Sequence, residues 1–406
     1  MPLASQASNV SSRCHRSTVV TTRSKSRAKL CRGQEAVQFH SLRSRGTHKF
    51  HPIKREINDC RGTCCTRTLK KLFYGIGLTA YKQASFCGPP VIQNPGCAGL
   101  IRAIVITLGD TLRMKASIVI RTLNEAEHLP ALFAGIATQE FPEGEIETVI
   151  VDSGSTDGTI DLAKYNNANL VHIAKADFSF GRSLNVGCQA ATGEALVFVS
   201  GHCIPASPRW VGELVTPLFQ GHAAYSYGKQ IGGNKTRFSE TRIFAKYFPD
   251  TSRVPQDGFF CNNANSALLK RVWANNPFDE TLTGLEDMHL AKRLVSQGHA
   301  VAYVAEAPVF HLHDENWRQI RRRFEREAIA LQHIMPDVHV SWADFVRYVS
   351  SAILLDMGAA LQQRRLRRVV GEIVLYRFMQ FWGSYRGSHM QRNLSRKRRE
   401  EYYYPR

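Results

Sequence analysis

The sequence predicts an α/β fold, with a mostly parallel sheet flanked by helices and a helical segment at the C-terminal end. From Met114 onward, short apolar runs rich in β-branched residues alternate with segments of helical periodicity. Strand–helix units this short favour parallel strands covered by helices. Near residue 335 the alternation stops, and longer helical patterns follow.

Each expected element has its own signal. Four buried strands are expected at "ASIVI", "ETVIVD", "LVHIA" and "ALVFVS", because continuous apolar runs of this length suit parallel strands. The first helix is expected where Leu129, Leu132, Phe133 and Ile136 repeat at helical spacing. Further helices are expected at "TIDLAKYN" and at "GRSLNVGCQAAT", and then at "FVRYVSSAILLDMGAAL" and "EIVLYRFMQFWGSYRG".

Charge divides the chain into three parts. Residues 1–113 hold 19 Lys/Arg against 4 Asp/Glu, and residues 361–406 hold 12 against 3, so the middle is slightly acidic although the whole chain carries +19. A basic surface that would favour nucleic acid is therefore not expected on the compact part. We expect a basic, Cys-rich extension at 1–113, a catalytic domain at 114–335, and amphipathic helices with a basic tail at 336–406.

The extension does not resemble a folded domain. Its first thirty residues contain no acid and many Ser, Thr, Arg and Lys, a composition that buries little apolar surface. Our hypothesis is that the functional protein begins at or near Met114; the alternative is a true targeting peptide. The middle keeps only Cys188, Cys203 and Cys261, as a reduced, cytoplasmic protein would.

Polar residues follow three of the expected strands. Ligands of open α/β sheets bind at the carboxyl ends of strands, so these residues are candidates for a site. They are also common turn formers, and that simpler interpretation stays open. The candidates are Thr122, Asn124 and Glu125 after the first strand, Asp152, Ser153, Ser155 and Asp157 after the second, and Ser200 and His202 after the fourth.

Six motifs in order carry a family resemblance. They are "SIVIRTLNEAEHL", "VDSGSTDGT", "GRSLNVGCQAATGE", "FVSGHCIP", "NNANSALL" and "GLEDMHLAKRL". Over about residues 116–325 the chain resembles family 2 glycosyltransferases, which are inverting enzymes with a GT-A fold. The resemblance implies that Thr122, Asn124, Glu125, Asp152, Ser153, Asp157, Arg182, Asn185 and Ser200 bind the sugar nucleotide. It assigns the role of catalytic base to Asp287, with Glu286 orienting the acceptor; helix-dipole stabilisation is the simpler explanation of these acids.

The metal motif departs from the family pattern. Family members usually end the fourth strand in Asp-x-Asp, whereas this chain has Ser200-Gly201-His202. His311 and His313 follow a later strand at a position that carries metal ligands in related enzymes. We therefore expect a divalent metal at His202, His311 and His313, with Mn²⁺ favoured over Mg²⁺, which prefers oxygen ligands. One alternative is a site without metal, in which a protonated His202 contacts the diphosphate. Another is that, of His311 and His313, one is a buried structural histidine and the other an exposed loop residue.

Acceptor binding is expected from two further stretches. "CNNANSALL" gathers Asn263, Asn265 and Ser266, whose polar groups suit sugar hydroxyls, and Arg322 and Arg326 share a helix face four residues apart. A turn and a solvated helix face are the corresponding simpler interpretations.

Together these features predict a hexosyl- or deoxyhexosyltransferase of cell-surface polysaccharide synthesis. It would use a nucleoside diphosphate sugar and a glycan or lipid-linked acceptor. A non-catalytic nucleotide-sugar-binding protein is the alternative; a dinucleotide oxidoreductase is disfavoured because "GSTDG" lacks the G-x-G-x-x-G spacing. The basic helices after residue 340 fit either peripheral contact with the inner face of the plasma membrane or a subdomain packed on the catalytic domain.

Overall fold

The computed structural model describes residues 114–142, 144–390 and 403. The hypotheses about residues 1–113 and the basic tail therefore lie outside the described residues. The strands are β1 (Met114–Thr122), β2 (Gly144–Asp152), β3 (Asn169–His172), β4 (Ala195–Ser200), β5 (Cys203–Pro205), β6 (Tyr225–Gly232), β7 (Asn265–Leu269) and β8 (Val301–His311). The helices are α5 (Leu129–Ala137), α6 (Thr159–Tyr165), α7 (Phe180–Ala190), α8 (Trp210–Phe219), α9 (Phe238–Tyr247), α10 (Lys270–Asn275), α11 (Glu286–Ser296), α12 (Trp317–Ile334), α13 (Trp342–Gln362) and α14 (Leu366–Ser388), with a 3₁₀ turn at Lys175–Asp177.

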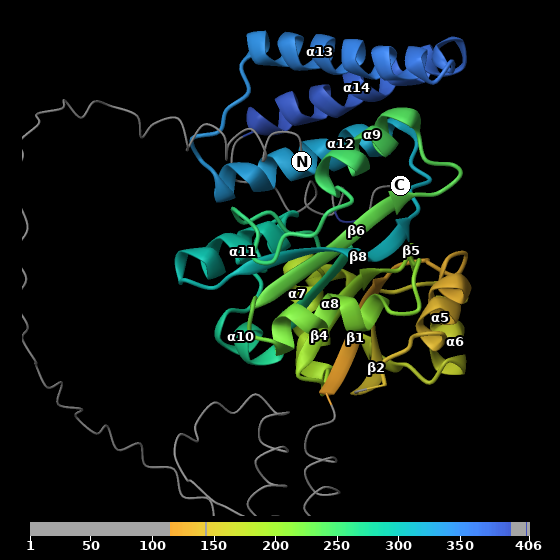
Figure 1. Ribbon diagram of the computed structural model, residues 1–406, viewed down its shortest axis with the longest axis vertical. Helices are drawn as coiled ribbons and strands as arrows, with labels where there is room; N and C mark the ends of the chain where they lie inside the picture. The colour runs from red at the N-terminus through yellow and green to blue at the C-terminus, as the bar shows by residue number, and fades with distance from the viewer. Residues whose placement is uncertain (1–113, 143, 391–402, 404–406) are drawn as a thin grey trace, which may run out of the picture. The chain divides into compact units, whose positions relative to one another are not determined.

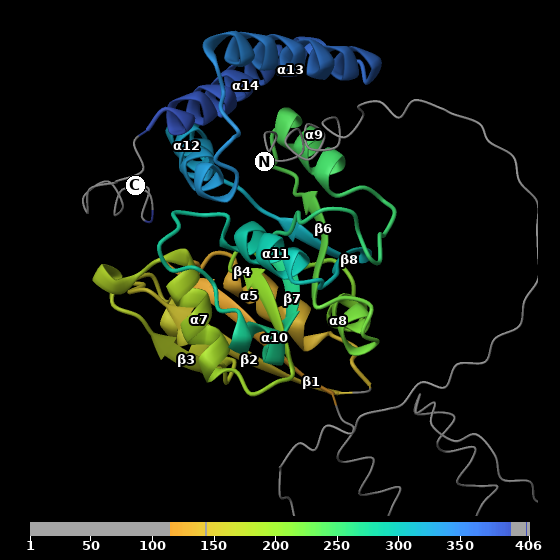
Figure 2. The same cartoon turned by 90° about the vertical axis from the view of Figure 1, so that its left-hand side faces the viewer.

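The strands form one mixed sheet in the order β3-β2-β1-β4-β7-β6-β8-β5. Figure 1 labels β1, β2, β4, β5, β6 and β8, and Figure 2 labels β3 and β7. Strands β1–β4, β6 and β8 run in one direction, and β7 and β5 run against them. The expected mostly parallel α/β sheet is therefore confirmed. The four strands expected from apolar runs are β1, β2, β3 and β4, and their interior residues form the core of the sheet.

Strand register places the polar strand ends together. Thr122 at the end of β1 lies beside Asp152 at the end of β2, and Arg121 lies beside Ser200 at the end of β4. On the other side, β5 pairs with β8 so that Cys203 lies opposite His311. The turn between β4 and β5, which carries His202, is thereby held against the end of β8.

The C-terminal helical segment is also confirmed. Helix α14 packs on α12 and on α9, and α13 packs on α14, as two views show (Figure 1, Figure 2). A buried ion pair joins Asp356 of α13 to Arg377 of α14 at 2.7 Å, and Arg377 also donates to the Ser239 carbonyl of α9. Among the described residues, no helix combines the length and apolar character that crossing a bilayer requires.

Candidate active site

The carboxylate of Asp152 organises the turn after β2. It accepts hydrogen bonds from the Gly154 and Ser155 backbone N–H groups at 2.9 and 3.0 Å and from the Ser155 and Thr122 hydroxyls at 2.5 and 3.1 Å. A carboxylate has about four lone-pair positions, and these donors fill them. Asp152, Ser153 and Thr122 are 0–3% exposed, and the Ser153 hydroxyl donates to the Thr122 carbonyl. These three side chains therefore shape the turn, and their contact with a nucleotide stays a prediction.

The loops after β1 and β2 are tied together by backbone-to-side-chain hydrogen bonds. Asn124, at a positive φ of 57°, receives the Thr156 N–H on its side-chain oxygen and donates its own N–H to the Ser155 hydroxyl. Asp157 accepts the Ala126 N–H at 3.0 Å. Burial opposes ionisation of Asp157, but its hydrogen bonds hold the pKa below the usual value. Asn124 and Asp157 are exposed, so they remain available to a ligand at this edge.

The residues of α7 and β4 that are expected to bind the nucleotide differ in how much of their side chain is used within the fold. The Asn185 amide accepts from the Trp273 indole N–H at 3.0 Å and donates to the Phe278 carbonyl at 3.0 Å. These hydrogen bonds anchor α7 to the segment after α10, and the expected contact of Asn185 with the nucleotide stays a prediction. Arg182 is exposed in the first turn of α7, and Ser200 is half-buried at the end of β4.

Three imidazoles meet where the β4–β5 turn touches the end of β8. His202, His311 and His313 each offer a ring nitrogen within 4.8 Å of the others. The ring centroids of His202 and His311 lie 5.2 Å apart, and those of His311 and His313 lie 4.0 Å apart. Residues from two distant parts of the sequence thus form a compact set of nitrogen donors that could hold one metal ion.

Carboxylates orient two of these rings. The His202 Nδ1 lies 3.1 Å from Glu125, and the His313 Nδ1 lies 2.8 Å from Glu240. An Nδ1–H that donates to a carboxylate leaves the Nε2 lone pair free, which is the arrangement found around metal-bound histidines. Burial works against ionisation of Glu240, but its hydrogen bond with His313 lowers the pKa to about 2. Glu125, expected in the nucleotide pocket, therefore also serves the histidine cluster.

The third ring is held by an amide. Gln230 donates through Nε2 to Asn262 at 2.9 Å, so its Oε1 faces His311 and accepts the Nδ1–H at 2.7 Å. His311 is buried, and its Nε2 has no hydrogen-bond partner among the described residues. Burial, followed by repulsion from His313, keeps the pKa of His311 well below its usual value. A neutral, buried Nε2 lone pair without a donor fits a metal ligand.

Asp287 lies buried at the start of α11, where its two oxygens accept the Asn263 and Met288 backbone N–H groups at 2.7 Å each. Burial and the adjacent Glu286 raise its pKa to about 7. The preceding Leu285 has a positive φ of 56°, an uncommon conformation for a branched residue and one that occurs at functional sites. A carboxylate with this pKa can take a proton near neutral pH.

Glu286 contacts a cation and an aromatic ring. Its carboxylate lies 3.2 Å from Arg121, and the Arg121 guanidinium lies 5.1 Å from the centre of the Phe180 ring. Arg326 of α12 lies over the same ring at 4.6 Å, which places it beside this group. Arg322, on the same helix, is half-buried.

The Asn263–Ser266 stretch is mostly interior. The Asn265 amide accepts from the Trp210 indole at 2.8 Å and donates to the Ala307 carbonyl at 2.8 Å, and both Asn265 and Ser266 are 0% exposed. The Asn265 side chain thus ties β7 to α8 and β8, and the Ser266 hydroxyl donates to the Asn263 side chain at 2.7 Å. Substrate binding by Asn265 and Ser266 stays a prediction. Asn263 is different: its Nδ2 has no partner among the described residues, and its backbone N–H reaches Asp287.

A hydrogen-bonded route connects the histidines to Asp287, and sequence reasoning missed it. It runs from His311 through Gln230 to the Asn262 side chain, and the next residue, Asn263, donates to Asp287. Nothing in the sequence indicates that Gln230 and Glu240 contact the histidines. Gln230 lies 81 residues from His311, and Glu240 lies 73 residues from His313.

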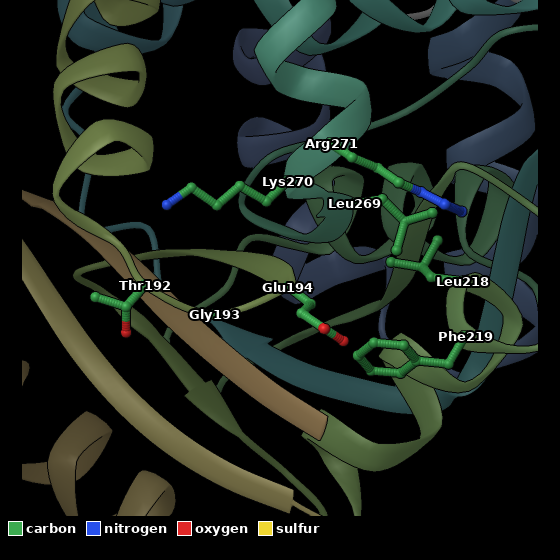
Figure 3. A pocket seen from close by; sticks show the side chains of 8 residues that line it. All are labelled: Thr192, Gly193, Glu194, Leu218, Phe219, Leu269, Lys270 and Arg271. Atoms are coloured by element: carbon green, nitrogen blue, oxygen red, sulfur yellow. The ribbon is translucent and has the colours of Figure 1, made fainter. Parts of the chain in front are cut away.

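A pocket of about 480 Å³ lies elsewhere (Figure 3). It is lined by Gly193, Glu194, Leu269 and Lys270, among others, at the beginning of β4. This is the opposite end of the parallel strands from the polar groups above, so we do not place the active site there.

Comparison with known proteins gives the family. Residues 117–276 match the model of glycosyl transferase family 2. An O-antigen chain rhamnosyltransferase of Salmonella typhimurium is 25% identical over 52% of this chain and 70% of its own length, and one of Salmonella anatum is 27% identical over 44% and 60%. A solved mannosyltransferase of Pyrobaculum calidifontis is 16% identical, covering 71% of this chain and 94% of its own, with a TM-score of 0.48. Residues 117–276 therefore form a domain that matches glycosyl transferase family 2, and they help to build the mixed sheet described above.

Proposed function

We propose that this enzyme transfers a hexose or deoxyhexose, with inversion, from a nucleoside diphosphate sugar to a glycan or lipid-linked glycan in surface polysaccharide synthesis. The relatives named as O-antigen rhamnosyltransferases support the deoxyhexose and the surface glycan. The observation that carries the proposal is the raised pKa of buried Asp287, linked by hydrogen bonds to a cluster of three imidazoles.

Asp287 would act as the base. The acceptor hydroxyl attacks the anomeric carbon from the face opposite the diphosphate, and its proton passes to the Asp287 carboxylate. The new carbon–oxygen bond forms as the bond to the diphosphate breaks, and the nucleoside diphosphate leaves with the electron pair. The backbone N–H groups of Asn263 and Met288 fix the carboxylate, and Arg121 holds the neighbouring Glu286 in place to orient the acceptor.

We further propose that His202, His311 and His313 hold a divalent metal. When bound, such an ion offsets negative charge on the diphosphate leaving group. The donors fit the role because each Nδ1 is engaged by Glu125, Gln230 or Glu240 and the opposite ring nitrogen is left available. Neutral nitrogen ligands favour Mn²⁺ over Mg²⁺.

The test uses the purified full chain. Release of nucleoside diphosphate is measured from UDP-GlcNAc, GDP-mannose and a nucleoside diphosphate rhamnose, in EDTA, Mg²⁺ or Mn²⁺, and Mn²⁺ binding is measured separately by calorimetry. We expect turnover of one donor with Mn²⁺, and loss of both turnover and Mn²⁺ binding in His311→Ala. His222→Ala, an exposed histidine after α8, is the control.

The outcomes separate the two parts of the proposal. Full turnover in EDTA would reject the metal site but keep the transferase. Donor binding without any turnover, in every metal, would support a non-catalytic nucleotide-sugar-binding protein instead.

A further inference from the structure

The hairpin of α13 and α14 presents apolar side chains to solvent. Three leucines on α13 are 64–70% exposed, although a helix packed on a domain normally turns polar residues outward. A second stripe on α14 follows at four-residue spacing, so it lies along one side of that helix. The residues are Leu354, Leu355 and Leu361 on α13, and Val370, Val374 and Phe378 on α14.

The fold does not use these side chains for its core. Phe345 and Ala360 of α13 face inward, as do Ile373 and Tyr376 of α14. The exposed leucines thus add apolar surface beyond what holds the hairpin to the domain. Large apolar side chains exposed together on one hairpin are typical of an interaction site.

Cations gather beside the leucines. Arg364 and Arg365 form the turn after α13, and Arg367 and Arg368 open α14, directly after Leu361. All four are exposed, and none is in an ion pair within the described residues. We call Leu354, Leu355, Leu361 and these four arginines the hairpin tip.

The acids of the same hairpin point elsewhere. Asp344 caps the start of α13, Asp356 pairs with Arg377 inside the hairpin, and Glu372 accepts the Phe238 backbone N–H. None of the three is left to neutralise the tip. Its positive charge is therefore available to an anionic partner.

Arg364 adds a conformational argument. Its φ of 56° lies in the left-handed region, and the backbone N–H groups of Arg364 and Arg365 close the end of α13 on Leu361 and Ala360. Glycine is the residue that adopts this helix-ending conformation without steric cost. The chain thus holds an exposed arginine where glycine would relax the backbone.

We propose that the hairpin tip docks on an anionic lipid bilayer. The leucines enter the boundary between headgroups and acyl chains, and the arginines pair with lipid phosphates. A two-fold contact between tips of two copies fits less well, because each tip would then face another cationic patch rather than anions. This inference does not depend on the proposed donor, acceptor or metal.

The test is co-sedimentation of the full chain with vesicles of phosphatidylcholine, with or without phosphatidylglycerol. We expect binding only to the anionic vesicles, weakening as salt is raised. Changing the four tip arginines to glutamine should weaken binding about fivefold per residue. Leu354→Ser together with Leu361→Ser should weaken vesicle binding at least about tenfold. Burying a single leucine side chain in an apolar environment already contributes a free energy that corresponds to about that factor. Arg271→Gln, an exposed arginine of α10, is the matched control.

Arg364→Gly separates binding from folding. It should bind anionic vesicles about fivefold more weakly, while its thermal unfolding temperature stays the same or rises. Equal binding to neutral vesicles, or binding that survives the arginine and leucine changes, would overturn the proposal. A dimer in solution that the leucine changes dissociate would instead make the tip a self-association surface.

Discussion

Replacing Asp287 with asparagine should abolish most transfer without unfolding the protein. Asparagine keeps the shape of the side chain and removes the carboxylate that would accept the proton. A positioned general base typically contributes about 10²–10⁴-fold, so we expect turnover to fall by that factor. Donor affinity should change little, because Asp287 bonds to the backbone of its own chain on both oxygens.

The structure also predicts the effect on stability. The folded-state pKa of about 7 lies above the ordinary 3.8, so the folded protein favours the neutral acid by about 4 kcal/mol. That contribution is present below about pH 4 and is lost as pH rises through about 7. Asparagine resembles the neutral acid but can accept only one of the two N–H bonds, which costs about 1–3 kcal/mol. At neutral pH the variant should therefore be at least as stable as the native protein.

The pH profile is the sharper assay. In the native enzyme, kcat/KM for nucleoside diphosphate release should rise tenfold per pH unit below about 7 and then level, because the base must be ionised. The residual rate of Asp287→Asn should show no such rise. Asp161→Asn, which removes an exposed acid in the first turn of α6, should leave the profile unchanged. A variant with near-native turnover, or one that keeps the rise, would refute the assignment of Asp287 as base.

Three further results are expected. Asp152→Ala should lower the free energy of unfolding by at least about 2 kcal/mol, because it leaves buried N–H and hydroxyl groups without an acceptor. A variant of unchanged stability that binds the sugar nucleotide more weakly in calorimetry would contradict this. Gln230→Leu should weaken Mn²⁺ binding about 10–100-fold by releasing the His311 ring, and unchanged Mn²⁺ calorimetry would exclude that positioning role. His202→Asp should shift the metal preference of transfer towards Mg²⁺, because Mg²⁺ prefers oxygen ligands. Without metal, the variant should destabilise the turn, because the new carboxylate faces Glu125. An unchanged metal preference in the transfer assay would count against His202 as a ligand.

The fold could be predicted where the signal is local. β1, β2 and β4 are continuous apolar runs, and apolar residues recur at helical spacing in the helices between them. Each of these elements can therefore be predicted from its own residues. The second half of the sheet lacks such signals. β5 has three residues, and β7 enters antiparallel between β4 and β6, so their places depend on pairing between distant segments.

The candidate site divides in the same way. The family resemblance predicts His202, His311 and His313 as ligands, but their closeness depends on the pairing of β5 with β8. The hydrogen-bond partners of Asp152 and Asn265 could not be predicted from the sequence. An Asp, Asn or Ser in a turn can bond either to a ligand or to the backbone, and its residue type does not distinguish the two. Which of the two occurs depends on the donors that surround the side chain, and folding brings those donors from other parts of the chain.

If a metal binds beside the end of β4, the imidazole of His202 has an electrostatic consequence. An Asp-x-Asp pair would cancel part of the charge of a bound divalent ion, whereas His202, His311 and His313 supply neutral nitrogen atoms. Glu125 and Glu240 sit behind the rings and contact them through Nδ1, and Glu315, beside His313, is paired with Arg323 at 2.7 Å. An ion held here would keep more of its positive charge for the diphosphate, and its own affinity would depend more strongly on that diphosphate. A site of this kind should therefore fill with metal and sugar nucleotide together, rather than with metal first.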